Sequence, residues 1–277
     1  MKTLPRITPR EPSASGTVTR ITQLLRVLAE ARGDISLGEI AQRINLPAST
    51  THRLLHLLMR EEFVDRGADS RSYRSGLELL RLSGLIVSGS GINELADKFM
   101  KAVVEESKET CLLSIYVRRS QATMVTRVIY SEHPLRYQVD MFSLTSAVWG
   151  ATGQGILAFL PDDEIDAIVA SEGPSPADRH RKLDVSGLRR ELAAIRERGY
   201  AYTKSQKVPG AIGMSAPVFD SSGVVAALCI TLPEYRFDPK MTGQWARTLV
   251  EHASRFSYAL GWRDPEETVG SRKGTRS

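Results

Sequence analysis

A cluster of hydrogen-bonding side chains between residues 36 and 58 offers the clearest chemistry in this sequence. Ser36 and Glu39 have the S-x-x-E spacing of a capping box, which satisfies free backbone N–H groups at a helix start. Asn45 tolerates the left-handed conformation of a tight turn, and Pro47 is accepted in a first helical turn, so a second helix is expected from about Pro47. The exposed face of that helix carries donors and almost no acid: Ser49, Thr50, His52, Arg53 and His56. Such a face suits the major groove of DNA, although an ordinary helical hairpin with a solvated polar face would show the same pattern.

A basic hairpin directly after these helices favours DNA binding over the plain helical hairpin. Residues 63–65 and 72–74 are expected to form two strands around a turn at 67–70. Arginines in such a hairpin suit contacts with phosphates beside the groove, so the segment predicts a winged helix-turn-helix that binds double-stranded operator DNA. The expected DNA contacts are Ser36, Ser49, Thr50, Thr51, His52, Arg53, Arg66, Arg71 and Arg74.

Length and composition agree with a cytoplasmic protein of two domains. The chain of 277 residues can form two cores, and its net charge of +5 favours a polyanionic partner. Cys111 and Cys229 lie in apolar runs and are too few for a metal cluster, so we expect reduced core thiols and no metal. No stretch approaches the roughly 20 apolar residues of a membrane span, and the N-terminus lacks a signal-peptide core, so no membrane partner is expected.

The expected organisation is an α+β chain of five segments. They are a disordered basic arm (1–16), a winged helix-turn-helix domain (17–76), a linker helix (77–90), a second domain (91–263) and a flexible tail (264–277). The linker helix is too apolar to stand alone, so it pairs either with its copy in a dimer or with its own second domain. In the second domain, helices are expected at 92–109, 152–159, 162–170, 186–198 and 242–262, and strands at 111–118, 123–129, 201–203, 213–219 and 224–231.

Three segments of the second domain could build a pocket for a small molecule. The glycine-rich run Ala147–Gly155 precedes a helix, and it either presents N–H groups to a carboxylate or serves only as a chain reversal. Cys229 and Thr231 lie two residues apart on one strand, so they share a face and either line a pocket or fill a core. The segment Tyr202–Ile212 is expected to be a loop that could close over a ligand.

Together these pieces resemble the isocitrate lyase regulator (IclR) family of bacterial transcription factors, from Thr17 to about Trp262. The resemblance is carried by SLGEIAQRINLPASTTHRLLHLL in the first domain and, in the second, by GQGILAFL from Gly153, RGYA from Arg198 and SAPVFDSSGVVAALCITLP from Ser215. It implies an N-terminal winged helix-turn-helix joined by a linker helix to a GAF-like α/β effector-binding domain. It also implies a homodimer or a dimer of dimers, with no cofactor and no catalysis.

The resemblance further implies where an effector would bind. By position, the family's site falls on Ala151, Thr152, Gly153, Thr203, Gly213, Cys229 and Thr231. This chain departs from the usual pattern, since Thr203 stands where an aspartate is common, Gly213 where a cysteine is frequent, and Cys229 and Thr231 where serines occur. With Trp149 beside the glycine run, these changes favour a larger and flatter anion, such as an aromatic carboxylate.

Two other classes of function stay open beside a regulator that senses a small carboxylated metabolite. One is an enzyme, but the sequence contains neither G-x-S-x-G nor H-E-x-x-H, and neither cysteine has a nearby histidine in a recognisable motif. We therefore expect no catalytic residue. The other is a DNA-binding regulator whose C-terminal domain only forms oligomers and senses nothing.

Overall fold

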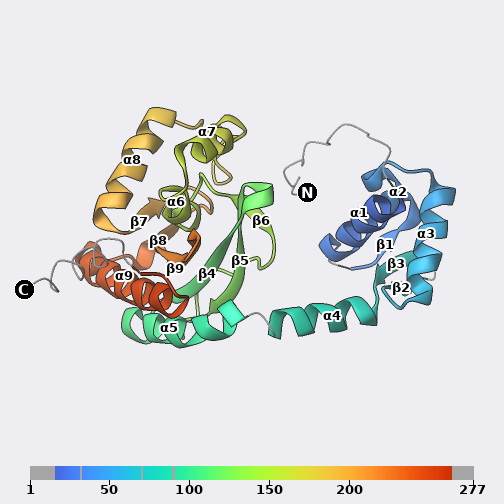
Figure 1. Cartoon of the computed structure of the whole chain (residues 1–277), viewed down its shortest axis with the longest axis horizontal. Helices are drawn as coiled ribbons and strands as arrows, with labels where there is room; N and C mark the ends of the chain where they lie inside the picture. Colours follow the sequence, from blue (N-terminus) through green and yellow to red (C-terminus); the bar gives the residue numbers. More distant parts are fainter. Residues whose placement is uncertain (1–15, 32, 70, 89–90, 264–277) are drawn as a thin grey trace, which may run out of the picture. The chain divides into compact units, whose positions relative to one another are not determined.

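The computed structural model describes residues 16–31, 33–69, 71–88 and 91–263 of the chain (Figure 1). They form two compact units, one before residue 89 and one after residue 90. The predicted basic arm (1–16) and flexible tail (264–277) lie outside the described residues, apart from Gly16, which precedes the first helix.

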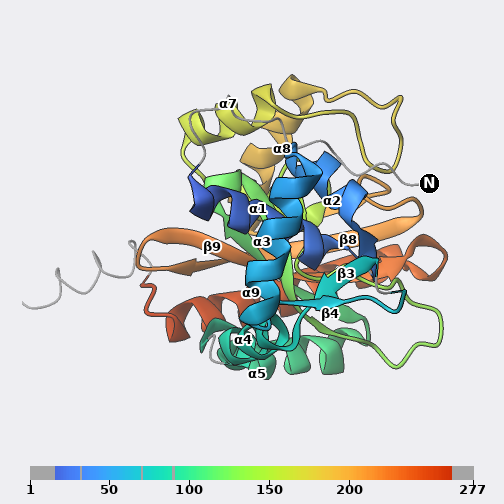
Figure 2. The same cartoon turned by 90° about the vertical axis from the view of Figure 1, so that its right-hand side faces the viewer.

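The winged-helix part of the first unit consists of three helices and a small sheet. The helices are α1 (Thr17–Glu30), α2 (Leu37–Ile44) and α3 (Ala48–Arg60). The sheet is antiparallel, and its strands are, in spatial order, β1 (Ile35–Ser36), β3 (Ser72–Ser75) and β2 (Val64–Arg66). Figure 2 shows α3 in front, with α1 and α2 behind it. The predicted helix-turn-helix with its β-hairpin wing is confirmed.

Local signals explain where α2 begins and ends. The Ser36 hydroxyl accepts a hydrogen bond from the Glu39 N–H (3.3 Å), and the Glu39 carboxylate accepts one from the Ser36 N–H (3.3 Å), so the capping box is complete. Asn45 has φ +52°, the left-handed conformation that ends the helix. Pro47 lies just before α3, as its N-cap residue.

The helix α4 (Leu77–Ser88) follows the wing and belongs to the first unit. Its apolar side chains are largely exposed: Leu77, Leu80, Leu85 and Ile86 have exposed fractions of 66%, 68%, 56% and 71%. Several exposed apolar side chains on one helix call for a covering surface.

A six-stranded antiparallel sheet forms the centre of the second unit, with the spatial order β6-β5-β4-β9-β8-β7. Its strands are β4 (Thr110–Val117), β5 (Ala122–Ile129), β6 (Leu144–Ser146), β7 (Ala201–Lys204), β8 (Ala211–Asp220) and β9 (Gly223–Pro233). The predicted hairpin of β8 and β9 is confirmed, with its turn at Asp220 and Gly223, and it is visible in orange in Figure 2.

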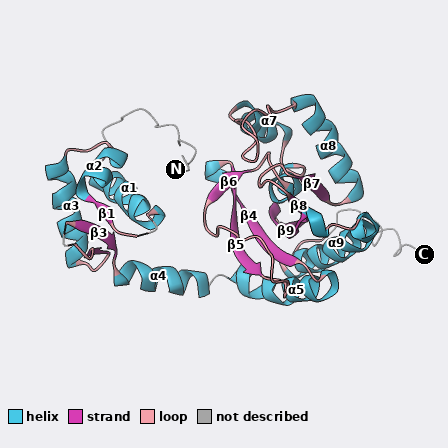
Figure 3. Ribbon diagram, turned by 180° about the vertical axis from the view of Figure 1, so that it is seen from behind, coloured by secondary structure: helices cyan, strands magenta, loops and turns pink. Residues whose placement is uncertain are grey.

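Helices cover both faces of this sheet, as Figures 1 and 3 show. On one face lie α5 (Gly91–Ser107) and α9 (Thr242–Ala259). On the other lie α6 (Ala151–Leu157), α7 (Asp162–Ala170) and α8 (Val185–Arg198). Short 3₁₀ turns occur at Arg118–Ser120, Glu234–Arg236 and Pro239–Met241. The predicted α+β class, with an α/β second unit, is confirmed.

Three features of the second unit differ from, or add to, the sequence expectations. The strand β6 was not predicted, because three residues are too short to show a period. The predicted loop Tyr202–Ile212 is wrong at both ends: Tyr202 and Thr203 pair with Met214 and Gly213, which leaves only 205–210 as the connection. The two thiols are buried and free, on opposite faces of the sheet, with Cys111 in the core beside α5 and α9 and Cys229 in the core beside α6 to α8.

Candidate functional site

The exposed face of α3 is a surface of hydrogen-bond donors without acidic residues. Ser49, His52 and Arg53 are exposed, and Thr50 is half-buried. The rings of His52 and His56 meet edge to face, with their centroids 5.1 Å apart. Such a set of side chains can donate to the base edges of a major groove.

Two of the expected DNA contacts do not fit this surface. Thr51 is fully buried, and its hydroxyl donates to the carbonyl of Pro47 (3.1 Å), so its assignment as a DNA contact is wrong. It shares the buried side of α3 with Leu54, Leu55 and Leu58. Ser36 is exposed, but its hydroxyl donates to the Glu39 carboxylate (3.1 Å) and accepts from the Glu39 N–H. A phosphate oxygen only accepts hydrogen bonds, so Ser36 caps α2 and offers DNA no free O–H.

The wing presents its arginines on a turn that internal hydrogen bonds hold in shape. Arg71 and Arg74 are exposed, and the guanidinium of Arg66 lies 4.7 Å from the centroid of the Tyr73 ring. The Asp69 carboxylate accepts from the N–H (2.8 Å) and the hydroxyl (2.5 Å) of Ser72, and these bonds lower its pKa. A turn held in this way fixes where the exposed Arg71 and Arg74 lie, and exposed arginines can bind phosphates.

The residues implied as an effector site come together on the sheet face that α6 covers. Thr203, Gly213 and Thr231 lie side by side on the adjacent strands β7, β8 and β9. Cys229 is two residues from Thr231 on β9, on the same face, and is buried in the core beneath α6. A Cβ on Gly213 would lie only 3.1 Å from the Ala151 Cβ, so the glycine lets α6 approach the strand closely.

The glycine run before α6 folds back on itself rather than presenting all its N–H groups. The Gly153 N–H donates to the Gly150 carbonyl (3.1 Å), and the Gly150 N–H donates to the Gln206 side-chain oxygen (3.1 Å). A Cβ on Gly153 would lie 2.4 Å from the Ala147 carbonyl oxygen, so this position requires glycine for a close backbone approach. The Gly153 N–H is therefore occupied within the run in this conformation, and carboxylate binding by the run stays a prediction.

Trp149 is buried, with an exposed fraction of 3%, and its ring packs against the connection between α7 and α8. Its indole N–H donates to the Gly173 carbonyl (3.0 Å), and the Arg181 guanidinium lies 5.8 Å from the ring centroid. Part of the aromatic surface expected to meet a ligand is thus already covered.

Lys207 is a residue of this region that the sequence analysis missed. It lies in the connection between β7 and β8, and its ammonium donates to the hydroxyls of Thr145 and Thr152, both at 3.2 Å. Its methylene groups come within 3.1 Å of the Cβ position at Gly150. Burial lowers the pKa of Lys207 to about 8, and burial raises the pKa of the Cys229 thiol to about 12. No periodic pattern marks one lysine of a polar turn as pointing inward.

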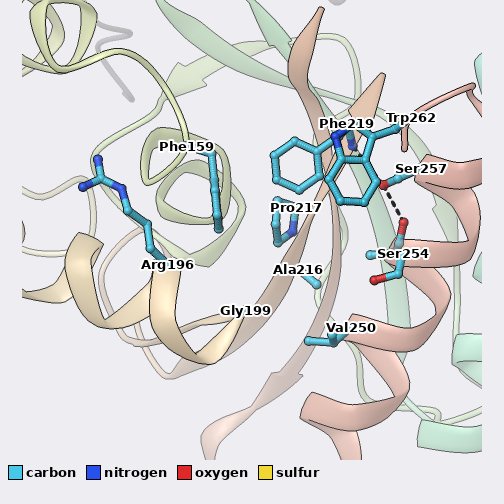
Figure 4. Close-up of a pocket in the computed structure, with 11 residues that line it drawn as sticks. Phe159, Arg196, Gly199, Ala216, Pro217, Phe219, Val250, Ser254, Ser257 and Trp262 are labelled. Atoms are coloured by element: carbon cyan, nitrogen blue, oxygen red, sulfur yellow. Dashed lines mark hydrogen bonds between the residues drawn. The ribbon is translucent and has the colours of Figure 1, made fainter. Parts of the chain in front are cut away.

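A cavity of about 150 Å³ lies elsewhere in the second unit (Figure 4). Its walls are Phe159, Arg196, Gly199, Ala216, Pro217, Phe219, Val250, Ala253, Ser254, Ser257 and Trp262. The rings of Phe219 and Trp262 stack with centroids 5.1 Å apart, and the Arg196 side chain points away from them (Figure 4). This cavity shares no residue with the predicted effector site.

Neither a metal-binding cluster nor a membrane-spanning helix occurs among the residues that the structure describes. Within them, no three His, Cys, Asp or Glu side chains are grouped so that they could hold a metal ion. No helix in that part of the chain combines the length and the apolar character needed to cross a bilayer.

Comparisons with known proteins identify both units. The family described as "Bacterial transcriptional regulator IclR C-terminal" matches residues 85–258, and the "IclR helix-turn-helix domain" matches residues 17–67. The "Transcriptional repressor IclR" of Escherichia coli is 22% identical over 246 residues, which cover 88% of this chain and 90% of the relative. The "Probable transcriptional regulator SauR" of Cupriavidus necator is 27% identical and covers 80% of this chain and 88% of the relative.

Solved structures share the fold. A regulator from Silicibacter superposes with a TM-score of 0.78 at 22% identity, over 90% of this chain and 98% of its own. An IclR homolog from Microbacterium hydrocarbonoxydans, solved in complex with 4-hydroxybenzoate, gives a TM-score of 0.74 at 20% identity, over 88% of this chain and 99% of its own. The family consists of transcription regulators and not of enzymes. This chain therefore belongs to the IclR family, as a DNA-binding regulator with an effector-binding C-terminal domain.

Proposed function

We propose that this protein binds operator DNA through α3 and the wing, and that an aromatic carboxylate bound in the second unit changes its affinity for that DNA. The observation that carries the effector proposal is the convergence of Thr203, Gly213, Thr231 and Cys229 beneath α6. The relative solved with 4-hydroxybenzoate supports an aryl carboxylate as the class of ligand.

The DNA contacts divide by chemistry. Ser49, Thr50, His52 and Arg53 read base edges, because they occupy the exposed donor face of α3. The wing arginines Arg66, Arg71 and Arg74 bind phosphates. Such contacts position the protein on DNA but do not read its sequence.

The side chains of the effector row favour a ligand with a large apolar part. Thr203 offers a hydroxyl, whereas the Thr231 hydroxyl already donates to the Ile212 carbonyl (3.2 Å). The Cys229 thiol stays neutral because burial raises its pKa to about 12. The row thus offers few hydrogen bonds and no negative charge, and an aromatic ring needs little more than apolar contact.

The exposed apolar side chains of α4 support a homodimer, which could pair further into a tetramer. Four of its large side chains are more than half exposed in the described chain. A single winged helix also reads few base pairs, so two copies that bind two half-sites recognise a longer DNA sequence.

A ligand screen tests the proposal against a regulator that senses nothing. The second reading has support, since Ala151, Thr152, Thr203 and Cys229 are all buried in this conformation. We expect 4-hydroxybenzoate or a related aryl carboxylate to raise the thermal midpoint, because a ligand of the native state stabilises it. The same compound should change the mobility shift of DNA from upstream of the protein's own gene. Retained DNA binding with no response to any carboxylate would favour the sensorless regulator.

A further inference from the structure

The ammonium of Lys207 is turned toward the predicted effector residues, and its hydrogen-bond partners among the residues that the structure describes are two hydroxyls. Its two acceptors are the Thr145 hydroxyl, on the edge strand β6, and the Thr152 hydroxyl, on α6. Its carbon chain packs against Gly150. The connection that carries it is fixed by its neighbour Gln206, whose side-chain oxygen accepts from the Gly150 N–H (3.1 Å) and from the Gln154 amide (2.9 Å).

Two other cations of the second unit, one largely buried and one exposed, each have a carboxylate partner. Arg236 is 18% exposed and pairs with the buried Glu109 at 2.6 Å. Lys204, in the same hairpin as Lys207, pairs with Glu234. Among the described residues, no carboxylate lies within salt-bridge distance of Lys207. Because burying an unpaired charge is costly, a site that keeps one is a candidate for binding the opposite charge.

Two titratable groups face Lys207: the Cys229 thiol and the Glu172 carboxylate. Cys229, on β9, has a thiol whose pKa is about 12, so it carries no charge near neutral pH. Glu172, just after α7, acts at longer range, and its carboxylate accepts a hydrogen bond from the Ser146 hydroxyl (2.7 Å). Neither supplies a direct counter-ion.

We propose that Lys207 is the counter-ion of the effector, and that it binds the effector's carboxylate between the hydroxyls of Thr145 and Thr152. The inference rests on the proposed function and deepens it, because it names the residue that makes the sensor select anions. The carboxylate replaces the two weak hydroxyl acceptors with a charge-assisted hydrogen bond, and the Thr152 hydroxyl can then donate to the same oxygens, while the Thr145 hydroxyl keeps donating to the Thr123 carbonyl (3.2 Å). The aromatic part of the ligand lies toward Cys229 and Thr231.

The experiment compares Lys207→Met with Lys204→Met, a matched loss of one lysine from the same hairpin at an exposed, paired position. Benzoate is the probe, and benzamide is its neutral counterpart of the same shape. Calorimetry should show benzoate binding to the wild type and to Lys204→Met with equal affinity, and about ten- to hundredfold more weakly to Lys207→Met. Benzamide should bind all three proteins alike.

A pH series on the wild type keeps the proposal testable if Lys207→Met fails to fold. Benzoate affinity should be constant below pH 8 and fall by up to about tenfold per pH unit above it, because the free amine loses its proton. Cys229 does not titrate in this range.

The possible outcomes separate the two proposals. Equal benzoate affinity in the wild type and Lys207→Met, or a flat profile from pH 7 to 9.5, would overturn the assignment of Lys207 and leave carboxylate sensing intact. If benzoate, acetate and pyruvate all fail to bind a wild type that still shifts DNA, both the counter-ion and the carboxylate sensor fall.

Discussion

Arg53 is the residue on which base reading should depend most strongly. Its side chain is exposed on the donor face of α3, and a bidentate arginine contact with a guanine discriminates by about 1 to 3 kcal/mol. We expect Arg53→Ala to weaken operator binding by that amount and to bind random DNA nearly as well as before. Arg74→Ala, in the wing, should weaken binding to both kinds of DNA and make the binding affinity less dependent on salt concentration. Fluorescence anisotropy with operator and scrambled duplexes measures both effects. If Arg53→Ala kept the wild-type preference for operator over scrambled DNA, the proposal that α3 reads bases in the major groove would be wrong.

Thr51 provides the control within the same helix and shows a signal that was available in the sequence. Positions 51, 54, 55 and 58 follow the i, i+3, i+4, i+7 spacing of a buried helix face, and the structure buries all four. Thr51→Val keeps the shape of that side chain, so base preference should not change.

Lys207 should make the unliganded protein less stable than a variant without it. The folded state lowers its pKa from 10.5 to about 8, so both states are protonated below pH 8 and the cost of burying the charge is then complete. Between pH 8 and 10.5 the folded state releases its proton first, and the cost disappears as pH rises. Lys207→Met should therefore be more stable than the wild type by about 1 to 3 kcal/mol at pH 7, since one pKa unit is worth about 1.4 kcal/mol and partial exposure reduces the effect. Urea denaturation at pH 7 and pH 10 measures the difference, which should shrink at the higher pH.

The capping box at the start of α2 is the element-scale feature with the clearest stability effect. Ser36→Ala removes the hydroxyl that accepts from the Glu39 N–H, and losses of this kind cost about 1 kcal/mol. Ser49→Ala is the matched control, because α3 has no side-chain cap and Ser49 is exposed. Circular dichroism should show a lower thermal midpoint for Ser36→Ala alone, whereas Ser49→Ala should affect only DNA binding. Equal midpoints for the two variants would mean that the capping box contributes nothing.

Elements with their own local signals were predictable, and elements defined by their partners were not. The capping box, the left-handed Asn45 and the alternation in β4 and β5 place their elements within one or two residues. The strands β1 and β6 have two and three residues, so they exist only through pairing with β3 and β5. The inward turn of Lys207 likewise depends on Thr145 and Thr152, which lie far from it in sequence. Tertiary contacts of this kind produce no periodic pattern in the sequence.

The exposed apolar side chains of α4 determine the assembly that we expect of the whole molecule. Leu80 is 68% exposed, and a glutamate there would put a charge into any apolar interface. Leu80→Glu should shift the mass measured by light scattering from dimer or tetramer toward monomer at micromolar concentration. Val185→Glu, at a 47% exposed apolar position on α8, serves as the control and should keep the wild-type mass. A monomeric wild type would contradict the dimer directly.

Signalling in the whole molecule requires that effector and operator affect each other's binding equally. The carboxylate can change operator affinity only by as much as it prefers one arrangement of the protein over another, typically about 1 to 3 kcal/mol, or roughly 5- to 150-fold. Thermodynamic linkage then requires the operator to change carboxylate affinity by the same factor and in the same direction. Calorimetric titration of benzoate with and without operator gives one factor, and anisotropy titration of operator with and without saturating benzoate gives the other. In Lys207→Met, both coupling factors should approach one when they are measured at the benzoate concentrations used for the wild type. Arg53→Ala should bind benzoate in the absence of DNA with wild-type affinity. If the two coupling factors of the wild type differed, benzoate would also act at a second site. If both factors equalled one, carboxylate binding would not be coupled to DNA binding.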